Sequence, residues 1–217
     1  MNLRYMGTKL SDQARQHLLL RHYIRRLPKV MHGFELLCEE KVVGVITFGF
    51  PASRHLQVGV CPSNPKSVLE LNRMWICRSQ KHGTASWLIS QALKRLPPSI
   101  IVSYADTAAG HDGTVYRAAN FFYAGWTDMD RKTPRYDYIP QHGGHSRSAF
   151  RSGQGVTCQK VRRRPKARYW TTTGSKGQKR SLMKACRWPR MDWRMEPVPT
   201  EHKKRLNHPA NIPPDRL

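Results

Sequence analysis

A strand, a loop, a helix and a second strand follow one another between residues 68 and 105, and this succession most restricts the fold. Residues 68–77 have a strand-like apolar pattern, and residues 85–96 place apolar side chains at helical spacing. Two prolines end that helix, and the apolar run 100–105 is typical of a buried strand. This alternation predicts an α/β domain with a mixed sheet.

Elements of both kinds flank this unit. Ser11 can cap a helix that runs to about Arg26. Residues 34–39 and 41–48 form a predicted hairpin, and residues 56–60 form a weaker predicted strand. Further along we expect a short helix at 114–120 and strands at 122–127 and 135–139. The predicted α/β domain therefore covers residues 1–140.

The charge is unevenly spread along the chain, whose formal net charge is +24. Residues 1–140 hold 19 basic and 10 acidic residues, whereas residues 141–217 hold 19 basic and 4 acidic ones. The second part also loses apolar periodicity and is rich in glycine and proline. We therefore expect a basic, largely irregular C-terminal extension at 141–217. Such an excess of positive charge points to a polyanion, most often nucleic acid.

The composition excludes several other classes of protein. With 39% apolar and 9% aromatic residues the chain can build a core, so it is not disordered throughout. The longest mostly apolar run, residues 42–52, is too short to span a membrane. The start of the chain lacks the apolar segment of a secretory signal. Five cysteines without a Cys-x-x-Cys motif argue against a disulfide framework, so we expect a cytoplasmic protein.

The loop Gln80-Lys81-His82-Gly83-Thr84-Ala85 lies between a predicted strand and a predicted helix. Backbone N–H groups at the start of a helix favour an anion such as a pyrophosphate. Gly83 allows close approach of the backbone, and Ala85 is small. An ordinary turn remains the alternative, because the loop is neither Gly-x-Gly-x-x-Gly nor a P-loop.

This loop, the strand before it and the hairpin together resemble the GNAT acyltransferases. Their Gln/Arg-x-x-Gly-x-Gly/Ala loop binds the pyrophosphate of acetyl-CoA, and Gln80, Gly83 and Ala85 match its fixed positions. The GNAT resemblance covers about residues 10–140, and a narrower resemblance, to the Mom DNA-modification proteins of Mu-like phages, lies inside it. It rests on Leu-Glu-Leu-Asn-Arg-Met-Trp at 69–75, Ala-Ser-Trp-Leu at 85–88, Ser-Tyr-Ala-Asp-Thr at 103–107, Gly-His at 110–111 and Val-Tyr-Arg-Ala-Ala-Asn-Phe at 115–121.

The Mom resemblance implies a GNAT-like mixed β-sheet flanked by helices and an enzyme that modifies double-stranded DNA. The implied reaction converts adenine to its N6-carbamoylmethyl form in the host cytoplasm and protects phage DNA from host restriction enzymes. The implied cofactors are acetyl-CoA or a related acyl-CoA and, as a further hypothesis, iron. Two alternatives stay open: an ordinary GNAT N-acetyltransferase acting on another amine, and a non-catalytic DNA-binding protein. No Asp/Asn-Pro-Pro-Tyr/Phe/Trp tetrapeptide of adenine methyltransferases is present.

The resemblance also singles out candidate catalytic residues. Asp106 follows the buried strand 100–105 and is the first candidate for a general base, although Asp in such a loop is by itself more typical of a turn. Tyr116 is a candidate acid for a departing thiolate, with packing on the sheet as the alternative. His22 and Tyr23, at the end of the first predicted helix, complete the catalytic set. A helix C-terminal histidine is the alternative for His22.

The remaining candidates concern binding. Arg73 and Ser86 flank the loop and are expected to contact cofactor phosphate, with a surface salt bridge and an ordinary helix serine as alternatives. Arginine interleaved with aromatic residues in the extension suits DNA phosphates and bases, or else a solvated tail. The predicted DNA-binding residues there are Arg162, Arg163, Arg164, Lys166 and Arg168.

An adenine must leave the duplex stack before its N6 can react. Trp87, Tyr104 and Trp126 are candidates for receiving the flipped base, and each is equally a candidate core residue.

Two groups of residues are candidate metal ligands. His142 and His145 with Cys158 and Cys186 are zinc-type ligands at irregular spacing. Asp106, Tyr104, His111 and Asp112 are donors suited to iron, with a solvated loop as the alternative.

Overall fold

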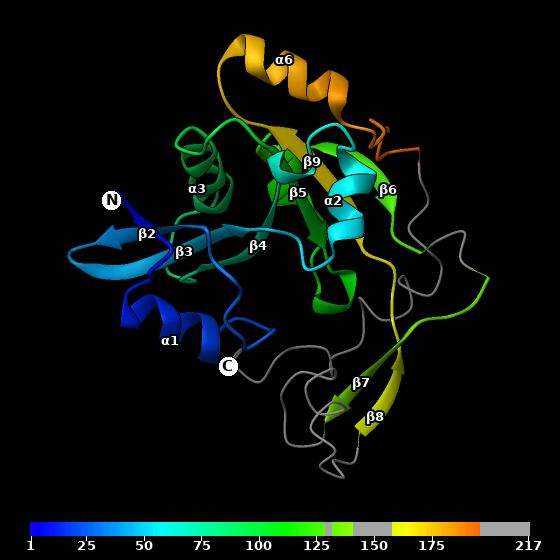
Figure 1. The fold of residues 1–217 in the computed structure, drawn as a ribbon. Helices are drawn as coiled ribbons and strands as arrows, with labels where there is room; N and C mark the ends of the chain where they lie inside the picture. Colours follow the sequence, from blue (N-terminus) through cyan, green and yellow to red (C-terminus); the bar gives the residue numbers. More distant parts are fainter. Residues whose placement is uncertain (129–131, 141–157, 196–217) are drawn as a thin grey trace.

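A seven-stranded mixed sheet with the strand order β1-β2-β3-β4-β5-β9-β6 forms the centre of the molecule (Figure 1). The structure is a computed structural model that describes residues 1–128, 132–140 and 158–195. The strands of this sheet are β1 (Asn2–Gly7), β2 (His32–Cys38), β3 (Lys41–Gly49), β4 (Val68–Ile76), β5 (Ile100–Ala105), β9 (Ala167–Thr172) and β6 (Phe122–Trp126). Only β4 and β5 pair in parallel, while every other pair in this sheet is antiparallel. The expected mixed sheet flanked by helices is confirmed.

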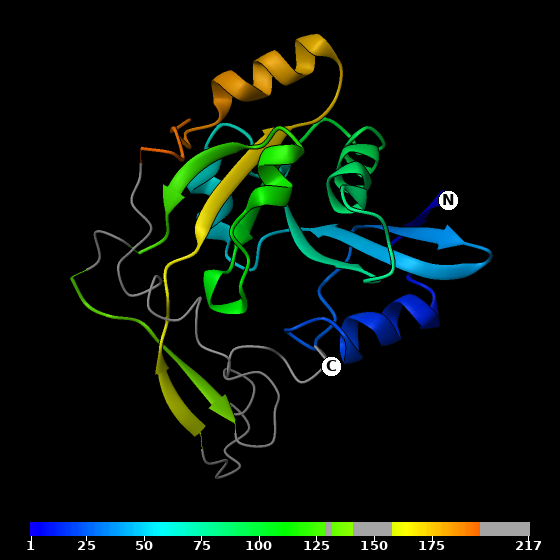
Figure 2. The same cartoon turned by 180° about the vertical axis from the view of Figure 1, so that it is seen from behind.

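Helices cover both faces of the sheet (Figures 1 and 2). The helices are α1 (Asp12–Leu20), α2 (Arg54–Val60), α3 (Thr84–Leu93), α4 (Thr114–Ala118) and α6 (Lys176–Ala185), with short 3-10 turns at Pro65–Ser67 and Thr107–Ala109. Leu88 and Ile89 of α3 pack with Tyr116 of α4 on one face. Val60 of α2 and Leu182 of α6 belong to the apolar cluster on the other face. No helix in the described part of the chain is long and apolar enough to cross a membrane.

The first helix is shorter than its apolar pattern predicts. Ser11 caps it as expected, since its side chain accepts a hydrogen bond from the Ala14 N–H at 3.2 Å, but the helix ends at Leu20 rather than near Arg26. The backbone of Arg25 is left-handed, with φ 47°, which no continuing helix allows. Leu20, Tyr23 and Ile24 are therefore not the buried face of a helix.

The predicted strand at 56–60 is wrong, because these residues form the helix α2. Leu56 and Val60 are spaced by one helical turn, and both contact the cluster that contains Val68 and Ile100. An apolar run this short fits a strand and a helix equally well, and its tertiary contacts decide between them.

The basic extension contributes an interior strand to the sheet. Strand β9 lies between β5 and β6 and pairs with both of them. Tyr169 and Trp170 of this strand are each 1% exposed, and the Trp170 indole N–H donates to the Pro189 carbonyl at 2.9 Å. The sheet therefore does not end at residue 140, where the sequence placed the domain boundary, and residues 167–188 are not irregular.

A separate two-stranded ribbon connects β6 to β9. It consists of β7 (Tyr136–Pro140) and β8 (Cys158–Arg162), paired antiparallel. Figures 1 and 2 show this ribbon projecting away from the main sheet. The chain then enters β9 through residues 163–166, which lie beside the open end of β5, where Lys166 forms an ion pair with Asp106.

Candidate active site

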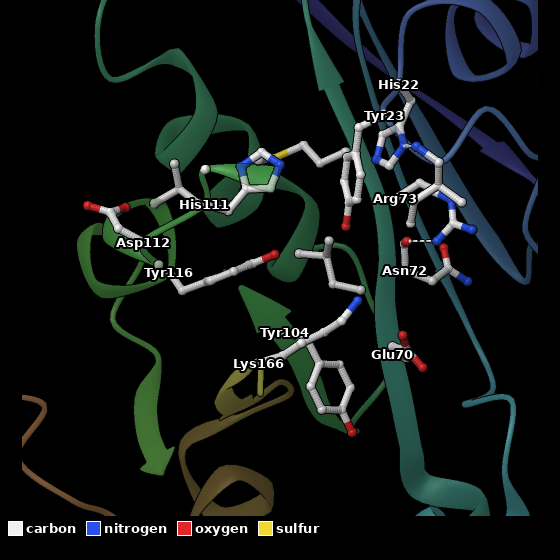
Figure 3. A pocket seen from close by; sticks show the side chains of 16 residues that line it. His22, Tyr23, Glu70, Asn72, Arg73, Tyr104, His111, Asp112, Tyr116 and Lys166 are labelled. Carbon is white, nitrogen blue, oxygen red and sulfur yellow. Dashed lines mark hydrogen bonds between the residues drawn. The ribbon is translucent and has the colours of Figure 1, made fainter. Parts of the chain in front are cut away.

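The parallel strands β4 and β5 separate after three paired residues. Val68–Glu70 pairs with 100–102, and the pairing of these two strands ends at Glu70. The Ser103 hydroxyl donates to the Leu71 carbonyl at 3.2 Å where the strands part. Beyond this point lies a cavity of about 350 Å³ (Figure 3). Its walls come from residues 22–24 after α1, from β4 and β5, from the loop and start of α4, and from Lys166.

A β-bulge in β4 lies in the wall of this cavity. Leu71 and Arg73 pair with Phe48 and Thr47, which are consecutive residues of β3, so Asn72 is an extra residue in β4. The Thr47 hydroxyl donates to the Asn72 side-chain oxygen at 2.6 Å and holds the bulge in place. Because a bulge shifts the alternation of side chains by one, it changes which residues of β4 face the cavity.

Arg73, predicted to contact cofactor phosphate, lines this cavity. Its guanidinium donates to the carbonyl of Asn72 at 2.5 Å and to that of Arg26 at 3.4 Å. These contacts fix its charge in the cavity wall, where an anionic group of a ligand can reach it.

His22 and Tyr23 lie side by side at one end of the cavity, next to Arg73 (Figure 3). Their rings stack with centroids 4.6 Å apart. Burial lowers the pKa of His22 to about 4, and the positive charge of Arg73 acts in the same direction. The His22 Nδ1 atom accepts a hydrogen bond from the Ile24 N–H at 3.1 Å, so the proton of the neutral ring lies on Nε2. His22 is therefore a neutral hydrogen-bond donor rather than a base in this state.

The hydroxyl groups of Tyr23 and Tyr116 point toward the middle of the cavity, as does the Lys166 ammonium (Figure 3). Tyr116 is 9% exposed, and its ring packs against Tyr169 and Phe121. Burial raises the pKa of Tyr23 and that of Tyr116. Both phenols are thus protonated near neutral pH and available as hydrogen-bond donors.

Asp106, the first catalytic candidate, does not line the cavity. Its Oδ2 atom lies 2.5 Å from Lys166 Nζ, and the aspartate side chain is 13% exposed. The Lys166 backbone N–H donates to the Thr127 hydroxyl at 2.8 Å, which fixes the other end of this lysine. The geometry thus places Asp106 where it positions Lys166, and its catalytic role stays a prediction.

Glu70 and Lys166 are cavity residues that sequence reasoning did not select as catalytic. Glu70 is the last residue of β4 that pairs with β5, and it lines the cavity. Burial raises its pKa, while the charges of Arg73 and Lys166 oppose that shift. A single carboxylate within the otherwise apolar start of β4 was the available signal. Lys166 had no comparable signal, because it lies in a segment full of basic residues.

The loop between β4 and α3 carries the remaining cofactor candidates. Gly83 is the N-cap of α3, has φ 86°, and has open space where a Cβ would lie. The Gln80 Oε1 atom is buried and has no hydrogen-bond partner among the described residues. The Ser86 hydroxyl donates to the Gly83 carbonyl at 3.0 Å, and Ala85 lies in the first turn of α3. This glycine-capped helix start fits a pyrophosphate, since first-turn N–H groups have no partner within the helix.

The three candidates for receiving a flipped base lie at different places in the structure. Tyr104 lines the cavity, whereas Trp87 lies on α3 and is 42% exposed. Trp126 is the half-buried last residue of β6.

The predicted DNA-binding residues also lie at different places in the structure. Arg162 is exposed at the end of β8, Arg163 and Arg164 are half-buried in the link to β9, and Arg168 is half-buried within β9. Only Lys166 of this set reaches the cavity between β4 and β5.

The predicted zinc ligands are not all described, because His142 and His145 lie outside the described residues. Cys158 begins β8, and Cys186 is half-buried after α6. Of the donors considered for iron, Tyr104, His111 and Asp112 line the cavity. Within residues 1–128, 132–140 and 158–195 no group of three or more His, Cys, Asp or Glu side chains could hold a metal ion.

The sheet, the separated parallel strands and the cavity between them define an α/β protein with a ligand-sized site in a split sheet. The chain belongs to the Mom protein family, whose family model matches residues 6–188. The match extends beyond residue 140 and includes β9 and α6, in agreement with their place in the fold.

Among curated proteins the chain is similar to the methylcarbamoylase mom of Escherichia phage Mu, with 32% identity over 119 residues. The aligned part is 52% of this chain and 49% of that protein. The chain thus matches about half the length of this relative.

Three solved structures share a loose likeness of fold. They are a Bacillus subtilis acetyltransferase in complex with CoA (TM-score 0.43, 13% identity, 80% of this chain and 100% of that one), a GNAT superfamily phosphinothricin acetyltransferase from Sinorhizobium meliloti in complex with AcCoA (0.44, 11%, 80% and 90%), and an N-acetyltransferase from Staphylococcus aureus Mu50 (0.41, 12%, 79% and 99%). A likeness at this level does not bear on the activity.

Proposed function

We propose that this chain is a transferase that converts adenine in double-stranded DNA to N6-carbamoylmethyl adenine and so protects phage DNA from restriction enzymes. The observation that carries the proposal is the family match over residues 6–188, within which the family-like segments 69–75, 103–107 and 110–121 form the walls of one cavity or adjoin it. The relative from phage Mu is named a methylcarbamoylase, which agrees with this reaction.

The cavity residues supply a proton acceptor and several donors. The N6 amine must lose a proton when a carbon atom is attached to it, and Glu70 is a half-buried carboxyl group with a raised pKa that suits this role. The Tyr23 and Tyr116 hydroxyls and the Lys166 ammonium face the same space (Figure 3). We assign these donors to negative charge that develops on the transferred group.

An acyl-CoA is the proposed cofactor, with Gln80, Gly83, Ala85 and Ser86 at its pyrophosphate and Arg73 nearer the reacting group. It would supply an activated acyl carbon. The carbamoylmethyl product, however, is joined to N6 through a methylene carbon, whereas acyl transfer joins a carbonyl carbon. Acyl transfer alone therefore does not make this product, and a second substrate or a later step belongs to the reaction.

Double-stranded DNA is the proposed partner. Helix α6 carries the cations Lys176, Lys179, Arg180 and Lys184 and no carboxylate. It lies on the outside of the sheet, and its basic residues are exposed (Figure 1). Such a surface attracts DNA phosphates through release of counterions, independently of sequence.

The test is mass spectrometry of nucleosides digested from plasmid DNA after expression in a bacterial host. Wild type should yield a new deoxyadenosine species in which a carbamoylmethyl group replaces a hydrogen, and Glu70→Gln and Asp106→Ala should reduce or abolish it. Glu40→Gln, in the exposed hairpin turn, is the matched control and should behave as wild type. Acetylation of another amine would favour an N-acetyltransferase, whereas unaltered nucleosides with intact DNA binding would favour a non-catalytic protein.

A further inference from the structure

A second cavity, of about 530 Å³, adjoins the first on the side of the ribbon-to-β9 link. From this cavity we infer a binding site for one extruded nucleotide of the DNA substrate, an inference that rests on the proposed function. The base would lie against Tyr104 and Trp188, and the flanking phosphates would lie among Arg135, Arg163 and Arg168. The volume falls within the range of about 300–1,000 Å³ that is typical of small-molecule sites.

The two cavities have two lining residues in common, Tyr104 and Lys166. In Figure 3 the Tyr104 hydroxyl points away from the hydroxyls of Tyr23 and Tyr116. Burial raises the pKa of Tyr104, so its phenol is protonated near neutral pH. A group held in the second cavity against Tyr104 therefore lies next to a residue that also lines the first cavity.

The aromatic wall is built for a flat, polarizable ligand. The rings of Tyr104 and Trp188 are 6.1 Å apart in an edge-to-face arrangement. The Arg168 guanidinium carbon lies 5.4 Å from the centre of the Trp188 ring. Nucleobases stack on aromatic side chains and on guanidinium planes, and both kinds of surface occur together here.

The charge of the wall suits phosphodiesters. Among the described residues that line the cavity, Arg135, Arg163, Lys166 and Arg168 are cations and Asp128 is the one carboxylate, while Lys166 also forms its ion pair with Asp106. The Asp128 carboxylate lies 3.6 Å from the Arg135 guanidinium. The positive excess attracts an anion, while the aromatic pair accepts an uncharged base, and a nucleotide combines both.

DNA rather than a small anion is the occupant that this arrangement favours. Chemistry on N6 requires the adenine to leave the duplex, at a cost of a few kcal/mol. Favourable contacts of the extruded base and its phosphates with this site would offset part of the free energy of unstacking. The exposed cations of α6 and of Arg162 lie outside the cavity, where the rest of a duplex can contact them.

The experiment compares binding to two DNA duplexes that are identical except at one position. One duplex is fully paired, and the other has 2-aminopurine opposite an abasic site at that position. Wild type should bind the second duplex about tenfold more tightly, and the fluorescence of the base should fall as it stacks. Trp188→Leu and Arg168→Gln should abolish this preference, while Trp188→Phe should keep most of it. Arg180→Gln, on α6, is the matched control and should weaken binding to both duplexes equally.

Thermal unfolding of each variant identifies losses caused by misfolding, and the Arg168→Gln result is decisive if the leucine variant is unfolded. A preference unchanged in folded Trp188→Leu and Arg168→Gln overturns the inference even if wild type modifies adenine. A Trp188-dependent preference without any modified nucleoside supports the nucleotide site while the proposed reaction fails. An equal preference for an unpaired base in RNA would overturn the assignment to DNA.

Discussion

Acid pH should destabilise this protein through His22. The ring is 7% exposed and neutral in the folded state, with its pKa lowered from 6.5 to about 4 by burial and by the nearby charges of Arg73 and His111. Below pH 6.5 the unfolded chain binds a proton at this position that the folded chain does not bind. The stability contributed by the neutral ring is therefore complete above pH 6.5 and is lost as the pH falls toward 4.

The magnitude follows from the same two values. One pKa unit corresponds to about 1.4 kcal/mol, so the full loss is about 3 kcal/mol below pH 4. We expect the free energy of unfolding of wild type to fall by about 2–3 kcal/mol more than that of His22→Gln between about pH 7 and about pH 4.5. Glutamine retains an acceptor for the Ile24 N–H and does not titrate.

Urea unfolding at each pH measures this difference, and the other titrating groups cancel between the two proteins as long as they act independently. A second measurement follows the His22 ring by NMR in the native protein, with the urea-unfolded chain as the control. Parallel pH dependences for wild type and His22→Gln, or a native midpoint near 6.5, would show that the burial argument is wrong.

Three further changes should have separable effects. Arg4→Ala removes the 2.7 Å partner of the fully buried Glu35 carboxylate and should cost about 2 kcal/mol in urea unfolding, whereas Arg4→Lys should cost less. Gly113→Ala would place a Cβ against the Tyr169 ring at φ 81° and should cost about 2–4 kcal/mol; an unchanged thermal midpoint would contradict this packing. Replacing the four cations of α6 by glutamine should reduce the slope of log affinity against log salt by about 0.9 for each DNA phosphate that the helix no longer neutralises; an unchanged slope would remove α6 from the DNA interface.

Local patterns in the sequence predicted the elements whose contacts lie close in the chain. The hairpin β2–β3, the strand β4, the helix α3 and the strand β5 each follow from apolar spacing with a turn or proline at the end. Arg73 and Tyr116 lie in the family-like motifs, whereas His22 and Tyr23 were selected because they close the first predicted helix. The structure brings all four to one cavity.

Contacts distant in the chain explain the failures. Strand β9 looked like part of a basic tail because arginine and lysine are frequent on both sides of it, yet Tyr169 and Trp170 are buried by β5 and β6. Lys166 reaches the cavity because β9 returns to the main sheet beside β5. The bulge at Asn72 depends on the register between β3 and β4, which no periodicity within one strand reveals.

The position of β9 between β5 and β6 has a consequence for synthesis of the protein. Strands β5 and β6 emerge from the ribosome before β9, and β6 pairs within the main sheet only with that later strand. Until about residue 172 has left the exit tunnel, the nascent chain exposes an incomplete sheet edge of the kind that chaperones recognise and that aggregates readily. A chain released early would lack Lys166 as well as the strand between β5 and β6, so the cavity that Lys166 lines would be incomplete.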